Sequence, residues 1–158
     1  MALNNSFLGV LDALSAAIMA DPDVTAFCQA QYGQHLTVKF GVRHIAHISD
    51  DELPLVQITR TEQTPEPKPG MLAETKDELL IYTLIFNQSD DADVEPGFRD
   101  ITQLTELIDQ AIQRNMRLGG LVKQIMPGES GYDEGVNYPK FASVLKAQVR
   151  REINLLAR

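Results

Sequence analysis

The order of helical and strand-like segments constrains this chain more than any single motif does. A helical opening leads into strand-like runs, a proline-rich segment and a longer strand-like run. One amphipathic helix and a final apolar run follow. Segments in this order predict an α+β fold, in which helices pack on a mixed or antiparallel sheet. With 158 residues the chain is long enough for one domain with its own core, and residues 1–158 are expected to form it.

Three helices are expected from apolar spacing and capping residues. The first covers about residues 5–20. The second, over residues 21–33, opens with Asp-Pro, which suits an N-cap followed by proline at the first helical position, and it ends at a glycine. The third runs from its cap, Asp100, to Arg117. Its continuous apolar stripe predicts the main core contact with the sheet and consists of Ile101, Leu104, Leu107, Ile108, Ala111 and Ile112.

Strands are expected where apolar residues alternate or run together between turn signals. These segments are Leu36–Val42, Leu55–Arg60, Glu78–Phe86 and the short run Leu121–Met126. Three further segments are expected to be loops, because they are rich in proline, acidic residues or glycine. They are Thr61–Ala73, Asn87–Arg99 and Pro127–Asn137.

The C-terminal run fits two kinds of element. Phe141, Leu145 and Val149 suit the alternation of a strand, but the same run also has helical spacing through Val144 and Ile153. The residues taken alone favour the helix slightly, and the strand stays open.

The expected strand Glu78–Phe86 carries apolar side chains on both faces. One face has Leu79, Ile81 and Ile85, and the other has Leu80, Tyr82, Leu84 and Phe86. One helix stripe covers only one face of a sheet, so the second face needs either the N-terminal helices or a partner subunit. The second face is therefore predicted as an oligomer or partner interface, to which the proline-rich segment adds Pro65, Pro67 and Pro69.

Composition excludes several classes of protein. The formal charge of −8 opposes nucleic-acid binding through the whole surface, because phosphates need a basic field. No apolar run approaches the length of a membrane span, and the first residues lack the basic region of a signal peptide. The single cysteine, Cys28, excludes an intrachain disulfide and fits a reducing cytoplasm.

Candidate chemical residues are few and scattered. His44 and His47, with His35 and Cys28 upstream, have the right side chains for a metal, but we interpret the histidines as polar surface at a strand end. Cys28 has the side chain of a thiol nucleophile, but its position on an apolar helix face favours a small core residue. The acidic segment 91–97 lacks the closing glutamate of a calcium loop and is expected to be a solvated loop. We therefore predict no catalytic residue, no metal, no cofactor and no enzymatic activity.

The chain resembles the tail terminator and tail completion proteins of long-tailed bacteriophages and prophages. The resemblance covers nearly the whole chain and rests on the order and hydrophobicity of its elements. These are an N-terminal helix, the strand Leu53-Pro54-Leu55-Val56-Gln57-Ile58, the strand Glu78–Phe86, the helix Ile101–Arg117 and a final strand opened by Tyr138-Pro139-Lys140-Phe141. The chain departs from the family in the extra helix over residues 21–33 and in the helical spacing near its C-terminus.

The resemblance implies a non-catalytic virion protein. Such a protein is assembled in the cytoplasm of a bacterial host and forms a hexameric ring on the finished tail tube, where it meets the tail tube protein and the head-tail connector. Two alternatives stay open. One is another neck or injection-apparatus protein, and the other is a small cytoplasmic enzyme whose site is built from residues distant in sequence.

Overall fold

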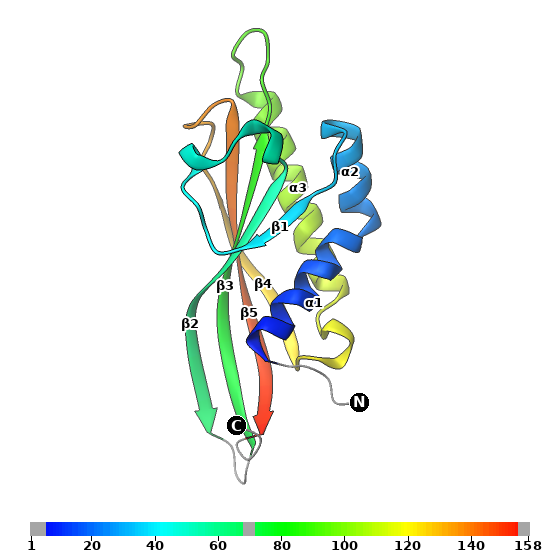
Figure 1. Ribbon diagram of the computed structural model, residues 1–158, viewed down its shortest axis with the longest axis vertical. Coiled ribbons are helices and arrows are strands. Elements are labelled where there is room, and N and C mark those ends of the chain that lie inside the picture. The colour runs from blue at the N-terminus through cyan, green and yellow to red at the C-terminus, as the bar shows by residue number, and fades with distance from the viewer. Residues whose placement is uncertain (1–5, 68–71, 155–158) are drawn as a thin grey trace.

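A computed structural model describes residues 6–67 and 72–154 of the chain (Figure 1). Within these residues lie three α-helices, three 3-10 turns and one five-stranded sheet, so the α+β prediction is confirmed. In chain order the elements are α1 (Phe7–Ala20), α2 (Pro22–Tyr32), β1 (Thr37–Phe40), η1 (Ile45–His47), η2 (Asp50–Glu52), β2 (Leu55–Pro67), β3 (Leu72–Phe86), α3 (Glu95–Arg114), η3 (Leu118–Gly120), β4 (Gln124–Tyr132) and β5 (Lys140–Asn154).

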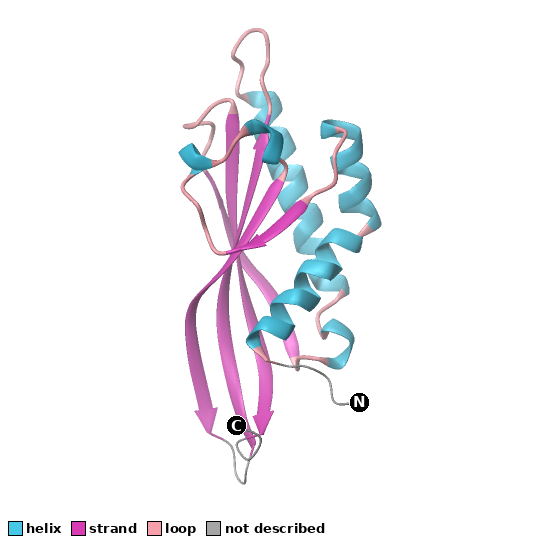
Figure 2. Ribbon diagram, in the orientation of Figure 1, coloured by secondary structure: helices cyan, strands magenta, loops and turns pink. Residues whose placement is uncertain are grey.

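The sheet is mixed, with strand order β1-β2-β3-β5-β4. β1 runs parallel to β2, and every other neighbouring pair is antiparallel. The three α-helices lie together on one side of this sheet, which we call the helix face (Figure 2). The main core fills the space between the helices and this face.

The first two helices follow their capping residues. The Ser6 hydroxyl accepts a hydrogen bond from the Gly9 amide, and the Asp21 carboxylate accepts from the amides of Asp23 and Val24. α2 ends at Gly33, whose φ of 64° is the left-handed conformation that closes many helices. Both predicted helices are confirmed.

Helix α3 is confirmed, but its predicted ends are wrong. It begins at Glu95, where the Asp93 carboxylate accepts from the Glu95 amide, and it ends at Arg114. Asp100 therefore lies inside the helix and is not its cap; its carboxylate accepts from the Asn87 side-chain amide at 2.8 Å. The predicted stripe is buried against the sheet except for Leu107, which is half-buried.

The prediction of a loop over Thr61–Ala73 is wrong for most of that segment. β2 continues to Pro67 and pairs with β3, with a bulge between Arg60 and Glu62. Proline is tolerated there because Pro65 and Pro67 occupy alternate positions on the outer edge, where a backbone N–H has no ladder partner to serve. The lower ends of β2, β3 and β5 project below α1 as an arm (Figure 1).

The helical reading of the C-terminal run is also wrong. β5 pairs with β3 along its whole length, from Lys140 to Asn154. Its alternate side chains from Phe141 to Val149 are buried on the helix face, which is the period of a strand. The predicted loop Pro127–Asn137 begins later than expected, because β4 runs through a bulge to Tyr132.

The second face of β3 is covered in its upper part by the connection from β1 to β2. This connection, residues 41–53, is called the strap here. It buries a small second core of Ile48, Leu53, Leu55 and Leu84. The N-terminal helices, one of the two covers expected from the sequence, lie on the opposite face (Figure 1).

Candidate interaction surfaces

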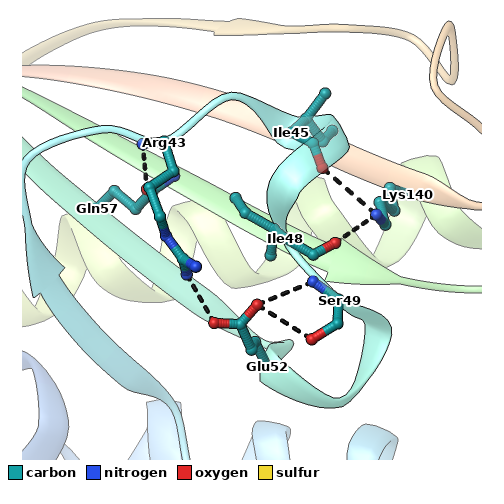
Figure 3. Close-up of polar contacts among 7 residues, drawn as sticks. All are labelled: Arg43, Ile45, Ile48, Ser49, Glu52, Gln57 and Lys140. Atoms are coloured by element: carbon teal, nitrogen blue, oxygen red, sulfur yellow. Dashed lines mark hydrogen bonds and ion pairs between the residues drawn. The ribbon is translucent and has the colours of Figure 1, made fainter.

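The strap is held on the sheet by Lys140, the first residue of β5. The Lys140 ammonium donates to the carbonyl of Ile48 at 2.5 Å and to that of Ile45 at 3.4 Å (Figure 3). It also lies 3.9 Å from a carboxylate oxygen of Asp50. The Ile45 carbonyl also accepts from the Ile48 amide at 3.2 Å, which closes the 3-10 turn η1. The Ile48 carbonyl comes just after that turn, and among the described residues the Lys140 amine is its hydrogen-bond donor, so the amine satisfies an acceptor that the short turn leaves open.

A second polar cluster joins the two ends of the strap. The Glu52 carboxylate accepts from the Arg43 guanidinium at 2.7 Å and from the Ser49 amide at 2.8 Å (Figure 3). The Arg43 hydrogen bond, followed by that of Ser49, lowers the pKa of Glu52 to about 2. The Arg43 amide in turn donates to the Gln57 side chain on β2 at 2.8 Å. The strap is thus fastened to itself and to the sheet.

The residues predicted as an interface do not form one continuous surface. Leu84 is only 4% exposed and is covered by the strap, while Tyr82 and Phe86 are half-buried around the same small core. Leu80 is half-buried lower on the same face. Pro65 is exposed on the arm; the side chain of Pro67 and the whole of Pro69 lie outside the described residues.

Below the strap, the same face of the sheet is hollowed. The hollow has a volume of about 520 Å³, which is within the usual size range of ligand pockets. Leu80 and Met126 give it an apolar floor, while Glu78, Glu129 and Lys146 stand around it. Among the described residues, these charges form one ion pair, between Lys146 and Glu129 at 3.7 Å, and both side chains are largely exposed. An exposed pair of this kind contributes little to stability.

A buried charge lies where the arm meets the helices. Asp77 on β3 is fully buried and accepts from the Arg151 guanidinium at 2.9 Å and from that of Arg60 at 3.4 Å. The Arg60 guanidinium lies 4.2 Å from the ring centre of Phe7 at the start of α1, a cation–π contact. The sequence analysis missed this cluster. Its signal was an aspartate on the face of β3 that otherwise carries Leu79, Ile81 and Ile85.

The candidate metal ligands do not converge. His44 and His47 are exposed on the strap with ring centres 6.0 Å apart, and the His44 ring accepts from the Ala46 amide. Cys28 is buried in the main core, and burial raises the pKa of its thiol to about 11, which disfavours the reactive thiolate. Among the residues that the structure describes, no group of three or more His, Cys, Asp or Glu side chains has the arrangement of a metal site.

The acidic segment before α3 is a turn and a helix start. Ser89 and Asp93 hydrogen-bond to one another, and the Asp93 carboxylate also accepts from the Glu95 amide. Gly97 lies inside α3, against the ring of Phe141. The predicted loop therefore ends before Glu95. No helix within the described ranges is long and apolar enough to cross a membrane.

Comparison with known proteins finds a chain with a similar fold. No family model matches the chain, and no curated protein matches it. A solved structure titled as the virion of a native gene transfer agent particle contains a chain with a similar fold. The TM-score is 0.50 at 10% sequence identity, and the match covers 96% of this chain and 98% of that chain. At this identity the likeness shows that the two chains share a fold over nearly their entire length.

Proposed function

We propose that this chain is a structural protein of a phage-like particle and that it caps the completed tail tube as a ring, next to the head-tail connector. The observation that carries the proposal is the fold shared over nearly the whole chain with a component of a gene transfer agent virion. The order of elements, which resembles that of tail terminator proteins, supports the same assignment.

The surfaces of the subunit are consistent with assembly. Large apolar side chains stay exposed at both edges of the sheet and around the start of α3, among them Phe40, Val42, Phe98 and Val136. The arm of β2, β3 and β5 projects beyond the helices, where it has room to meet a neighbour (Figure 1). A closed ring uses such features through a head-to-tail contact that repeats until the circle is complete.

Electron microscopy of the purified protein, alone and mixed with purified tail tubes, tests the proposal. Rings with a central channel, seated at one end of the tubes, are the expected result. Tubes whose ends stay bare at saturating protein concentration would refute the capping role. A monomer that forms no rings and binds no tubes would return attention to an enzyme, with the hollow beside Leu80 as the place to look for substrate.

A further inference from the structure

The edges of the sheet differ in whether they can accept another strand. An open edge presents unpaired backbone groups, and proteins usually protect it with proline, charge or a covering segment. On the arm, Pro65 and Pro67 remove two of the outward N–H groups of β2. On the lower part of β4, Pro127 lacks an N–H, and the outward amide of Ile125 already donates to the Met116 carbonyl at 2.6 Å. These two stretches are therefore closed to strand addition.

Two other stretches are open. In β1, the amides of Thr37 and Gly41 donate towards β2, so alternation turns the backbone groups of Val38 and Phe40 outward. The part of β4 after its bulge, Ser130–Tyr132, is called upper β4 here. The Asp133 amide that follows it donates to β5, so alternation turns the backbone groups of Tyr132 outward. Among the described residues, no hydrogen bond reaches these outward groups of Val38, Phe40 or Tyr132.

The two open stretches lie at the same level of the sheet. Following paired residues from strand to strand, Val38 shares a row with Tyr132, and Phe40 shares a row with Ser130. The first row is Val38, Val56, Thr83, Ser143 and Tyr132; the second is Phe40, Ile58, Ile81, Leu145 and Ser130. β1 and β4 also run in opposite directions, so a neighbour that continues the sheet places β1 antiparallel to β4. Equal height favours a closed circle over a climbing helix.

The side chains along these stretches match. Paired residues in a row share a face, and both Val38 and Tyr132 pack at the border of the main core on the helix face. Phe40 is 43% exposed on that face. Phe98 of α3 is 39% exposed, with its ring centre 5.9 Å from that of Tyr132. Joining the two edges would bring Phe40 of one subunit towards Phe98 and Tyr132 of its neighbour and cover these exposed aromatic surfaces.

The charges also match. From His35 to Arg43 the chain has two formal charges, both positive: Lys39, and Arg43, which also pairs with Glu52. From Glu129 to Glu134 it has three, all negative: Asp133, Glu134, and Glu129, which also pairs with Lys146. A two-fold contact of β1 with a second β1 would oppose like charges, whereas β1 against upper β4 brings opposite charges together.

We propose that β1 of one subunit pairs antiparallel with upper β4 of a second copy of this chain, with Val38 opposite Tyr132, so that the sheet continues from subunit to subunit around a closed ring. The contact rests on the proposed function, since it supplies the head-to-tail interface of that ring. It uses a different surface from the apolar face of β3 at Leu80, Tyr82, Leu84 and Phe86.

Cysteine pairs test the contact. Lys39→Cys and Gly131→Cys would lie opposite one another in the new ladder, and a Cβ at Gly131 meets only the Val144 side chain at an ordinary 3.6 Å. Under mild oxidation, a mixture of the two single variants is expected to give a disulfide-linked dimer, and each variant alone is expected to give no disulfide-linked dimer. Cys28 is buried and leaves the background low. The matched control replaces Lys39→Cys with Gln63→Cys, an exposed position on the arm two residues before Pro65. This control should give no disulfide-linked dimer with Gly131→Cys.

Every outcome decides between the contact and its rivals. Cross-linking of Lys39→Cys alone would show a two-fold contact and overturn the proposal, and so would a mixture that gives no more dimer than the control. Phe40→Ser, added to Lys39→Cys, should reduce the mixed dimer several-fold while the protein stays folded, since Phe40 is 43% exposed and lies outside the buried core. Rings seen by microscopy without the mixed cross-link would leave the proposed function standing and remove this contact. Cross-linked rings that do not bind tail tubes would leave this contact standing and remove the proposed capping function.

Discussion

Removing the Arg151 guanidinium should destabilise the protein far more than removing an exposed arginine. Arg151→Met keeps the length of the side chain but leaves Asp77, which is fully buried, with Arg60 alone at 3.4 Å. Breaking a buried ion pair on one side costs about 3–5 kcal/mol, because a charge stays behind without its partner. Since Arg60 remains and is partly exposed, we expect about 3 kcal/mol, the lower end of that range.

Urea unfolding followed by circular dichroism measures the loss. For a domain of this size, about 3 kcal/mol also lowers the melting temperature by roughly 6–12 °C. The matched control is Arg99→Met, which removes an exposed ion pair with Glu95 and should cost less than about 0.5 kcal/mol. The double variant Asp77→Leu, Arg151→Met should recover part of the loss, because neither charge of this buried pair remains. Equal unfolding midpoints for the Arg151 and Arg99 variants would refute the reasoning.

Three further predictions concern the core, a close contact and pH. Ile108→Asp buries an unpaired charge under α3 and should cost about 3–5 kcal/mol in urea unfolding; a wild-type midpoint would mean that α3 is not core. Gly97→Ala places a Cβ 2.1 Å from the Phe141 ring and should lose about 1–3 kcal/mol despite the better helix propensity of alanine, and a stabilised variant would contradict the packing. The pKa of Glu52 is lowered from 4.5 to about 2, so its ionised carboxylate stabilises the fold fully above pH 4.5, and this stabilisation is lost as pH falls towards 2. The unfolding midpoints of wild type and Glu52→Gln should therefore converge on acidification, and a constant difference would contradict this account.

The sequence was most informative where one strong local pattern agreed with the tertiary structure. The stripe along α3 and the Asp-Pro opening of α2 predicted their helices because burial and capping favour the same conformation there. Errors came where pairing across the sheet overrode composition. The proline-rich end of β2 is a strand because β3 supplies its inner partners, and β5 is a strand because it pairs with β3 over 15 residues.

The surfaces were harder to predict than the fold. Apolar alternation in β3 marked a second apolar face, but it did not indicate that residues 41–53 would cover the upper part of that face. That cover depends on contacts across long sequence distances, such as Lys140 with the carbonyl of Ile48. The pairing of Asp77 with Arg151, 74 positions away, is invisible to local pattern for the same reason.

The strap offers a final prediction, because a single amine fastens its middle to the sheet. Lys140→Met keeps the aliphatic chain but leaves the Ile48 carbonyl without its donor, while the Ile45 carbonyl keeps the Ile48 amide. An unpaired acceptor costs about 1–3 kcal/mol if it stays buried. Water can reach the Ile48 carbonyl once the strap lifts, so local opening relieves that cost at the expense of the small core around Leu84.

We therefore expect Lys140→Met to loosen the strap more than it weakens the whole fold. Amide hydrogen exchange should quicken over residues 41–53 and leave the protection of α3 unchanged, and a dye that binds apolar surface should fluoresce more strongly as Leu84 becomes exposed. Lys146→Met is the matched control, since its amine has only a long, exposed pair with Glu129. Uniformly faster exchange across strap and core would mean that Lys140 supports global stability. Unchanged exchange in the strap would mean that Ile48 and Leu53 hold it by packing alone, because those side chains are buried in the small core with or without the amine.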